Sequence, residues 1–216
     1  MEAYLDNSAT TRVDAQVQEL MKKLMDVDFG NPSSRHQKGV VAEGYIKEAR
    51  QKIAATLKVD PKELIITSGG TESNNMALIG TALAAKRKGN HIITTAVEHP
   101  SVKATASFLE EQGFRITFLS VDSRGQISLE DLKEALTPDT ILVSIMYVNN
   151  EIGTIQPVEE AAKLVHATVP GAVFHVDAIQ AYGKVMIRPK QQGIDLLSVS
   201  SHKFHGPKGA GFLYCS

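Results

Sequence analysis

Short apolar runs alternate with helical patterns along most of the chain. Seven runs rich in β-branched and apolar residues predict strands at 63–67, 91–97, 115–121, 140–148, 173–177, 196–200 and 210–214. Segments with helical periodicity predict helices at 15–27, 34–57, 72–88, 101–112, 129–135 and 158–168. Because the strands are too apolar to leave one face in water, we expect a mainly parallel sheet with helices on both faces, in three α/β/α layers.

The last predicted strand differs from the others in its connection. Residues 201–209 join the sixth and seventh strands and show no helical pattern. A parallel neighbour needs a long crossover, so a direct connection favours an antiparallel last strand. Residues 1–13 lack helical periodicity and predict an irregular N-terminal arm that lies against another part of the protein, while 14–216 form one large domain.

Composition and charge exclude several functions. The chain has 216 residues, 43% of them hydrophobic, and its 23 basic and 24 acidic side chains give a net charge of -1. No run of like charges indicates nucleic acid or a membrane surface as a partner. Cys215 is the single cysteine, which rules out an internal disulfide and a four-cysteine metal site. Without a signal peptide or an apolar run of about 20 residues, we expect a cytoplasmic protein and no metal.

The exits of the first two strands carry candidate ligand-binding groups, because ligands of parallel sheets bind outside the carboxyl ends of the strands. Ser68-Gly69-Gly70-Thr71 follows the first strand and opens a helix. Free N–H groups there, with the Thr71 hydroxyl, would bind a phosphate, although a simple helix cap with a glycine turn is an equal alternative. His99 follows the second strand, and Pro100 would fix the direction of its ring.

The exits of the fourth and fifth strands are also polar. Asn149-Asn150-Glu151 either forms a turn or directs one side chain into the site. Asp177 ends a buried strand, where a carboxylate is costly unless it meets a cation such as a protonated pyridine nitrogen or a lysine. Gln180 can reach the same space, whereas His175 is interpreted as a core residue with satisfied hydrogen bonds.

The sixth strand leads into the segment with the strongest chemical signal. Lys203 stands at the strand's end, after Ser200 and His202 and before a Gly/Pro-rich turn. A lysine held there beside short hydrogen-bond donors suits a Schiff base with a phosphate-bearing cofactor. Taken alone, the segment is also compatible with an ordinary exposed loop. Together with the phosphate cradle and the buried acid, it predicts a site for pyridoxal 5'-phosphate.

A set of motifs distributed along the whole chain resembles cysteine desulfurases, which are fold-type-I pyridoxal phosphate enzymes of the class-V aminotransferase superfamily. The branch that supplies sulfur for iron–sulfur clusters is the most similar. The motifs are Tyr4-Leu5-Asp6-Asn7-Ser8-Ala9-Thr10-Thr11, Gly30-Asn31-Pro32-Ser33-Ser34-Arg35-His36, Thr67-Ser68-Gly69-Gly70-Thr71-Glu72-Ser73-Asn74, Glu98-His99-Pro100-Ser101-Val102, Val148-Asn149-Asn150-Glu151-Ile152-Gly153, His175-Val176-Asp177-Ala178-Ile179-Gln180 and Ser201-His202-Lys203.

The resemblance implies roles for the candidate residues. Lys203 would hold the cofactor as a Schiff base and later move protons. Asp177 would keep the pyridine nitrogen protonated, and His99 would stack on the ring and act as acid or base. The other implied cofactor-binding residues are Gln180 and Asn149 at the ring or the substrate, and Gly70, Thr71, Ser200 and His202 at the phosphate. Gly70 stands where alanine is commoner in the family, and Ser201 where glycine is commoner.

The resemblance also implies a reaction and partners. L-Cysteine would be converted to L-alanine, and its sulfur would pass to an enzyme cysteine as a persulfide and then to an acceptor or iron–sulfur scaffold protein. The enzymes are homodimers, and they continue well beyond the length of this chain. We therefore expect the small domain, with which the arm at 1–13 would pack, and the sulfur-accepting cysteine to be absent from these 216 residues. Cys215 is not expected to take that role, and the chain is expected to be inactive alone.

Two other functions stay open at this stage. Another class-V enzyme, such as a selenocysteine lyase or an aminotransferase of the alanine–glyoxylate type, would use much the same site. A non-catalytic binding module that keeps only the fold or the cofactor is the alternative from a different class.

Overall fold

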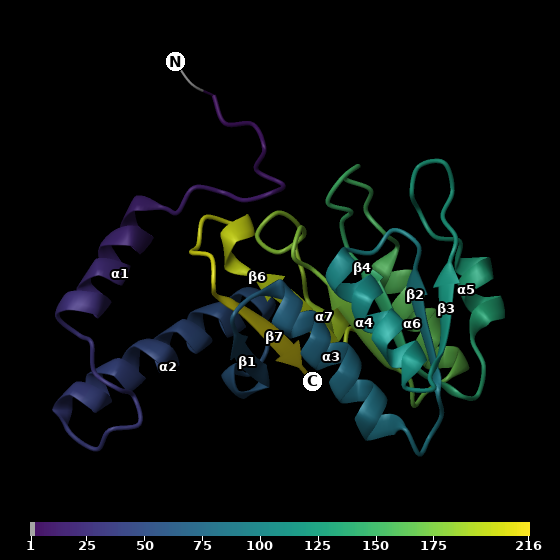
Figure 1. Ribbon diagram of the computed structural model, residues 1–216, viewed down its shortest axis with the longest axis horizontal. Helices are drawn as coiled ribbons and strands as arrows, with labels where there is room; N and C mark the ends of the chain where they lie inside the picture. Colours follow the sequence, from purple (N-terminus) through teal and green to yellow (C-terminus); the bar gives the residue numbers. More distant parts are fainter. Residues whose placement is uncertain (1–2) are drawn as a thin grey trace.

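The computed structural model describes residues 3–216 and contains one seven-stranded sheet in the order β1-β7-β6-β5-β4-β2-β3 (Figure 1). The strands are β1 Leu64–Thr67, β2 His91–Thr95, β3 Arg115–Leu119, β4 Thr140–Met146, β5 Val173–Asp177, β6 Leu196–Ser200 and β7 Gly211–Cys215. Neighbours from β3 to β6 pair in parallel, and β7 is antiparallel to both β6 and β1. The mainly parallel sheet with a reversed last strand is confirmed.

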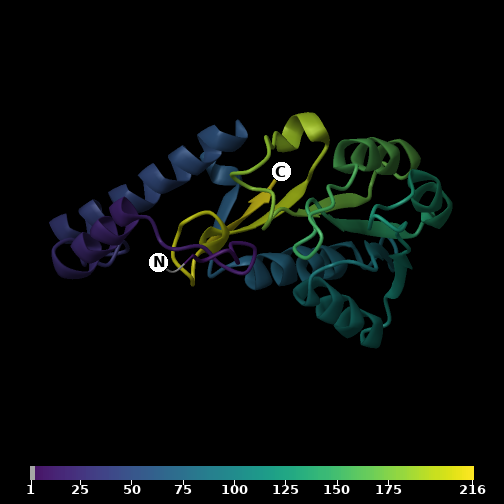
Figure 2. The ribbon, with the colours of Figure 1, turned by 90° about the horizontal axis from the view of Figure 1, so that it is seen from above.

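Helices cover both faces of this sheet. The helices of the described residues are α1 Ala15–Asp26, α2 Gln37–Leu57, α3 Gly70–Ala85, α4 Pro100–Glu111, α5 Leu129–Ala135, α6 Val158–Thr168 and the short α7 Pro189–Gln192, with single 3₁₀ turns at Pro61–Glu63 and Ser201–Lys203. Figure 2 shows α3 and α4 on one face and α5, α6 and α7 on the other. The three-layer arrangement is the one that the strand pattern predicts.

Two apolar clusters form the core, one on each face. Leu78 of α3 and Val102 and Leu109 of α4 pack on one side of the sheet. On the other side, Leu132 of α5 and Val165 of α6 belong to the larger cluster. Alternate residues of the central strands face alternate clusters, so both faces of each strand are dry and the carboxyl ends become the accessible edge.

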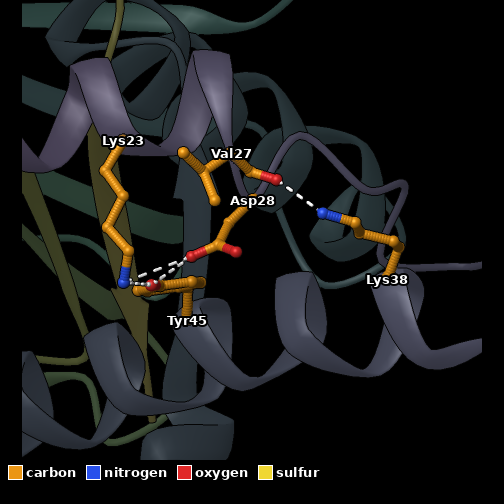
Figure 3. A network of polar contacts seen from close by, with 5 residues as sticks. All are labelled: Lys23, Val27, Asp28, Lys38 and Tyr45. Atoms are coloured by element: carbon orange, nitrogen blue, oxygen red, sulfur yellow. Dashed lines mark hydrogen bonds and ion pairs between the residues drawn. The ribbon is translucent and has the colours of Figure 1, made fainter.

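Helices α1 and α2 project from one side of the sheet (Figure 1) and are joined by a polar cluster that Figure 3 shows. Lys23 Nζ donates to the Tyr45 hydroxyl over 2.8 Å, and that hydroxyl donates to Asp28 Oδ2 over 2.7 Å. Lys38 Nζ reaches the Val27 carbonyl over 2.7 Å. These contacts link the end of α1 to two turns of α2, and the Tyr45 hydrogen bond holds the pKa of Asp28 below its usual value.

The N-terminal arm lies against the loop that follows β6. The Thr11 N–H donates to the His202 carbonyl over 2.8 Å, and the Asp14 N–H donates to the His205 carbonyl over 2.9 Å. Of the arm predicted at 1–13, residues 1 and 2 lie outside the described residues. Its packing with a small domain stays a prediction. Within residues 3–216, no helix combines the length and the hydropathy needed to cross a bilayer.

Most element bounds agree with the sequence pattern to within two or three residues. Strand β4 ends at Met146 and not at residue 148, and α3 begins at Gly70, two residues before the predicted start. The four-residue α7 was not predicted, because one helical turn carries too little periodicity to be recognised.

Gly211 tests the close packing of β7 against the turn after β1. A Cβ at Gly211 would lie 2.5 Å from the Val199 carbonyl oxygen and 2.7 Å from the Gly69 Cα, so backbone must move. We expect Gly211→Ala to lower the free energy of unfolding by about 1–3 kcal/mol in urea titrations. Gly44→Ala is the matched control, since nothing lies within 4 Å of that position in α2. Gly44→Ala should raise the free energy of unfolding by about 0.5–1 kcal/mol. Equal changes in the two variants would contradict the close packing at Gly211.

Candidate active site

A cavity of about 510 Å³ opens at the carboxyl ends of β4, β5 and β6, beside the start of α3. Eight of the nine predicted site residues line it: Gly70, Thr71, His99, Asp177, Gln180, Ser200, His202 and Lys203. The cavity wall also contains Asn150 and Glu151, from the polar exit of the fourth strand, and five residues without a predicted role: Ser8, Ala9, Met146, Val148 and Ile179. The fold therefore gathers side chains from distant parts of the sequence around one space.

Lys203 ends the 3₁₀ turn after β6, at the edge of this cavity. Its Nζ donates to two arm carbonyls, that of Ser8 over 2.5 Å and that of Ala9 over 2.8 Å. Burial, and after it the positive charge of Lys184, lowers the pKa of this amine, while the carboxylates of Asp177 and Asp6 oppose the shift. A lowered pKa increases the neutral, nucleophilic fraction of a lysine at a given pH.

Ser201 closes the loop that carries Lys203. Its hydroxyl lies within hydrogen-bond distance of the Pro207 and Ala210 carbonyls and shares its single proton between them. Its own carbonyl accepts from the Gly206 N–H over 3.0 Å. A serine at this position, where glycine is commoner in the family, thus stabilises the turn and leaves the amine in place.

Asp177 is the last residue of β5 and is only 4% exposed. Oδ1 accepts from the Ile179 N–H over 3.0 Å, and Oδ2 accepts from Asn74 Nδ2 over 2.8 Å. Burial raises its pKa. Among the described residues, no lysine or arginine forms an ion pair with it. A buried carboxylate that lines a cavity without a cationic partner fits a ligand that brings a positive charge, such as a pyridinium nitrogen.

The start of α3 forms the opposite wall. Gly69 has φ 149°, which a side chain rarely tolerates, and α3 begins without a side-chain cap. Gly70 and Thr71 of the first turn line the cavity together with Ser200, so the positive end of the α3 dipole lies at the cavity wall. Gly69 is the cap residue of α3 and forms the glycine turn, while Gly70 and Thr71 line the cavity. The phosphate-binding role of this turn stays a prediction.

His99 caps α4 and faces the cavity. Its Nδ1 accepts from the Ser101 N–H over 3.1 Å. In the neutral ring, the proton is therefore on Nε2. The cap and Pro100 together fix the ring direction, as the sequence predicts.

Asn149 lies behind the cavity wall and is not one of its lining residues among those that the structure describes. Its Oδ1 accepts from the N–H groups of Glu151 and Ile152 over 2.9 and 3.0 Å, and its Nδ2 donates to the Val97 carbonyl over 3.1 Å. Of the two interpretations, the structure shows the turn for this side chain. Asn150 and Glu151 line the cavity, and the cofactor role of Asn149 stays a prediction.

His175 lies in the core with both ring nitrogens bonded. Nδ1 lies 2.8 Å from the Ser144 hydroxyl, and Nε2 lies 2.9 Å from the Ser198 hydroxyl. Burial lowers its pKa to about 3, so the ring is neutral at physiological pH. The interpretation of His175 as a satisfied core residue is confirmed.

Glu98 is a buried acid whose importance the sequence pattern did not reveal. Its Oε1 accepts from the Thr95 hydroxyl and from the Met146 N–H, each over 2.8 Å, while Oε2 has no hydrogen-bond partner. Burial raises its pKa to about 8, with a smaller contribution from the charge of Asp177. As a neutral acid, Glu98 links the end of β2, through Thr95, to the end of β4, through Met146. The sequence places Glu98 between the predicted strand at 91–97 and His99, but nothing in the sequence distinguishes it from a surface glutamate.

The combination of an α/β/α sheet, a strand-end lysine, a buried carboxylate and an uncapped helix start at one edge is the arrangement of a pyridoxal phosphate-binding fold. Residues 3–216 match the class-V aminotransferase family. The chain belongs to this family, whose cofactor is pyridoxal phosphate.

Individual known proteins are similar over nearly the whole chain. Cysteine desulfurase IscS of Dictyoglomus turgidum is 51% identical over 213 residues, which are 99% of this chain and 54% of that protein. The solved structure of a NifS-like protein has a TM-score of 0.97 at 43% identity and covers 100% of this chain and 59% of its own. A structure titled SspA in complex with cysteine has a TM-score of 0.95 at 41% identity, over 99% of this chain and 61% of its own. The chain spans about half the length of the curated relatives it matches.

The buried Glu98 makes stability depend on pH. Its folded-state pKa of about 8 lies above the ordinary 4.5, so its contribution is complete below about pH 4.5 and is lost as the pH rises toward 8. We expect the wild type to lose a few kcal/mol more than Glu98→Gln over this range, because the amide keeps the hydrogen bonds without ionising. Urea titrations of both proteins at several pH values measure the difference. Parallel pH dependences would show that Glu98 is not a buried neutral acid.

Proposed function

We propose that this chain is the cofactor-binding part of a pyridoxal phosphate-dependent cysteine desulfurase. The observation that carries the proposal is the buried carboxylate of Asp177, which forms no ion pair with a lysine or arginine among residues 3–216 and lines the same cavity as Lys203. The similarity of nearly the whole chain to proteins named cysteine desulfurase supports the choice of reaction.

Each side of the cavity would hold one part of the cofactor. Lys203 would be the covalent attachment point, and Asp177 would bind the ring nitrogen. The phosphate would lie at the start of α3, against Gly70, Thr71, Ser200 and His202. The family resemblance assigns Gln180 and Asn149 to the ring substituents or the substrate. When bound, the cofactor supplies an electron sink for bond cleavage at the substrate.

The protein residues would supply binding and proton movement. The lowered pKa of Lys203 allows its amine to attack a carbonyl and, when released, to accept and return a proton. His99 presents Nε2 to the cavity as a second acid or base. In the overall reaction, L-cysteine and an enzyme thiol give L-alanine and an enzyme persulfide, so no external oxidant is needed.

The sulfur-accepting thiol would not be Cys215. Cys215 pairs with Leu196 at the start of β6, whereas Lys203 follows the end of that strand. The two ends of β6, Leu196 and Ser200, are four residue steps or about 13 Å apart along the strand. Cys215 lies beside the first end and Lys203 follows the second, so the thiol lies at the opposite edge of the sheet. Burial also raises the pKa of this thiol, which lowers its thiolate fraction. The proposal includes a sulfur-accepting cysteine outside these residues. It also includes a homodimer, a cytoplasmic location and a sulfur-acceptor or iron–sulfur scaffold protein as partner.

Trapping with borohydride tests the attachment site. We expect pyridoxal phosphate and borohydride to leave a covalent adduct on the peptide that contains Lys203. Lys203→Ala should lose this adduct, and Lys208→Ala, in the same loop, should keep it. Mass spectrometry of proteolytic peptides identifies the site. An adduct that persists in Lys203→Ala would move the attachment elsewhere.

Incubation with substrate tests the reaction class. A protein of these 216 residues should bind pyridoxal phosphate yet form no persulfide from L-cysteine, because Cys215 lies at the wrong edge of the sheet. Adding the remaining part of a related cysteine desulfurase as a separate chain should restore alanine release. Mass analysis of Cys215 and an alanine assay are the measurements. A persulfide on Cys215 alone would contradict the proposal, and continued inactivity of the mixture would favour a non-catalytic module. A clear preference for selenocysteine would favour a selenocysteine lyase.

A further inference from the structure

Lys184 lies in the turn that follows β5, four residues after Gln180, and lines no part of the cavity among the described residues. Its ammonium nevertheless donates to Gln180 Oε1 over 3.1 Å. It is thus one residue removed from the site, and the assigned roles of the site residues do not use it.

Packing joins the Lys184 turn to the loop that carries Lys203. The Tyr182 ring meets the Phe204 ring edge-on, with centroids 5.0 Å apart. A Cβ at Gly183 would be in ordinary contact with Phe204, 3.5 Å from its Cβ. These contacts of Phe204, which follows Lys203, with Tyr182 and Gly183, which precede Lys184, hold the two segments together.

A chain of hydrogen bonds connects the two lysines. Because Lys184 occupies Gln180 Oε1, the Gln180 amide turns its Nε2 toward the arm, where it donates to the Ser8 carbonyl over 2.8 Å. Lys203 Nζ donates to the same carbonyl over 2.5 Å. A flipped amide would set an acceptor against the Ser8 carbonyl and a donor against the ammonium, so the Lys184 charge selects one amide orientation.

The charges around Lys203 oppose one another. Asp177 and Asp6 favour its ammonium form, and Lys184 disfavours it. His202 precedes Lys203 in the loop, and burial, followed by the positive charges of Lys203 and Lys208, lowers the pKa of its ring. Burial raises the pKa of Asp177, and the charges of His99 and Lys203 partly oppose this rise. Among the residues that the structure describes, Lys184 is the positive side chain that counteracts the two acids at the Lys203 amine.

We propose that Lys184 is a positioning residue for the Lys203 amine: it fixes the amide of Gln180 with its N–H groups toward the site, and it sets a second positive charge beside the amine. This inference rests on the proposed function, since it concerns the amine that would attach the cofactor. It assigns a role to a side chain that touches neither the cofactor cavity nor a reacting atom.

The test is the pH dependence of adduct formation at Lys203. Wild type, Lys184→Met, Lys184→Arg and Lys184→Gln are each mixed with pyridoxal phosphate over a range of pH, reduced with borohydride, and analysed for the Lys203 peptide. We expect the midpoint to move to higher pH by about half a unit or more in Lys184→Met, because loss of a like charge raises the pKa of the amine. Lys184→Arg should retain the wild-type midpoint. Lys184→Gln keeps a donor without the charge and should shift as Lys184→Met does.

Lys133→Met is the control for loss of a positive charge elsewhere, since Lys133 is exposed on α5. It should leave the midpoint unchanged. An unchanged midpoint in both Lys184→Met and Lys184→Gln, or a shift in Lys184→Arg equal to theirs, would overturn the role of Lys184 while the adduct on Lys203 still supports the proposed function. No adduct on Lys203 in the wild type would overturn both.

Discussion

The candidate site depends above all on a buried carboxylate that forms no ion pair with a lysine or arginine in the described part of the chain. Asp177 ends a central strand, is 4% exposed, and receives one N–H donor at each oxygen. Leaving a carboxylate in this state costs free energy unless it is protonated or a cation reaches it. The surrounding elements are arranged so that the free approach is from the cavity, where Lys203 and the start of α3 also lie. A ligand with a cationic ring and an anionic tail would place the ring beside Asp177 and the tail at the start of α3.

Two buried side chains, Glu98 and His175, stabilise the same edge of the sheet, and neither is among the residues that line the cavity. Glu98 joins the ends of β2 and β4 as a neutral acid, and His175 bridges the hydroxyls of two neighbouring strands as a neutral base. Both groups are kept uncharged by burial, so they fix the backbone without adding charge beside Asp177. The N-terminal arm adds a third support, because its Ser8 carbonyl accepts from both Gln180 and Lys203.

Much of this could be predicted from the sequence, and the exceptions have physical reasons. The strands and their reversed last member follow from apolar runs and from the lack of a crossover in 201–209. Strand exits predicted eight residues of the cavity wall, because parallel strands deliver their ends to one edge. Asn149 shows the limit of that reasoning, since its amide bonds to its own turn and its neighbours face the cavity. The arm residues and Lys184 could not be predicted, because their contacts cross about 170 to 195 residues of sequence or act through a second side chain. The orphaned oxygen of Glu98 likewise depends on packing alone.

The most direct test of the central claim is the protonation state of the ring nitrogen of isotope-labelled pyridoxal phosphate bound to the protein, measured by nitrogen NMR near neutral pH. A protonated nitrogen in the wild type and an unprotonated one in Asp177→Asn is the predicted result. An unprotonated nitrogen in the wild type, or a protonated one that survives Asp177→Asn, would show that the buried carboxylate has another purpose.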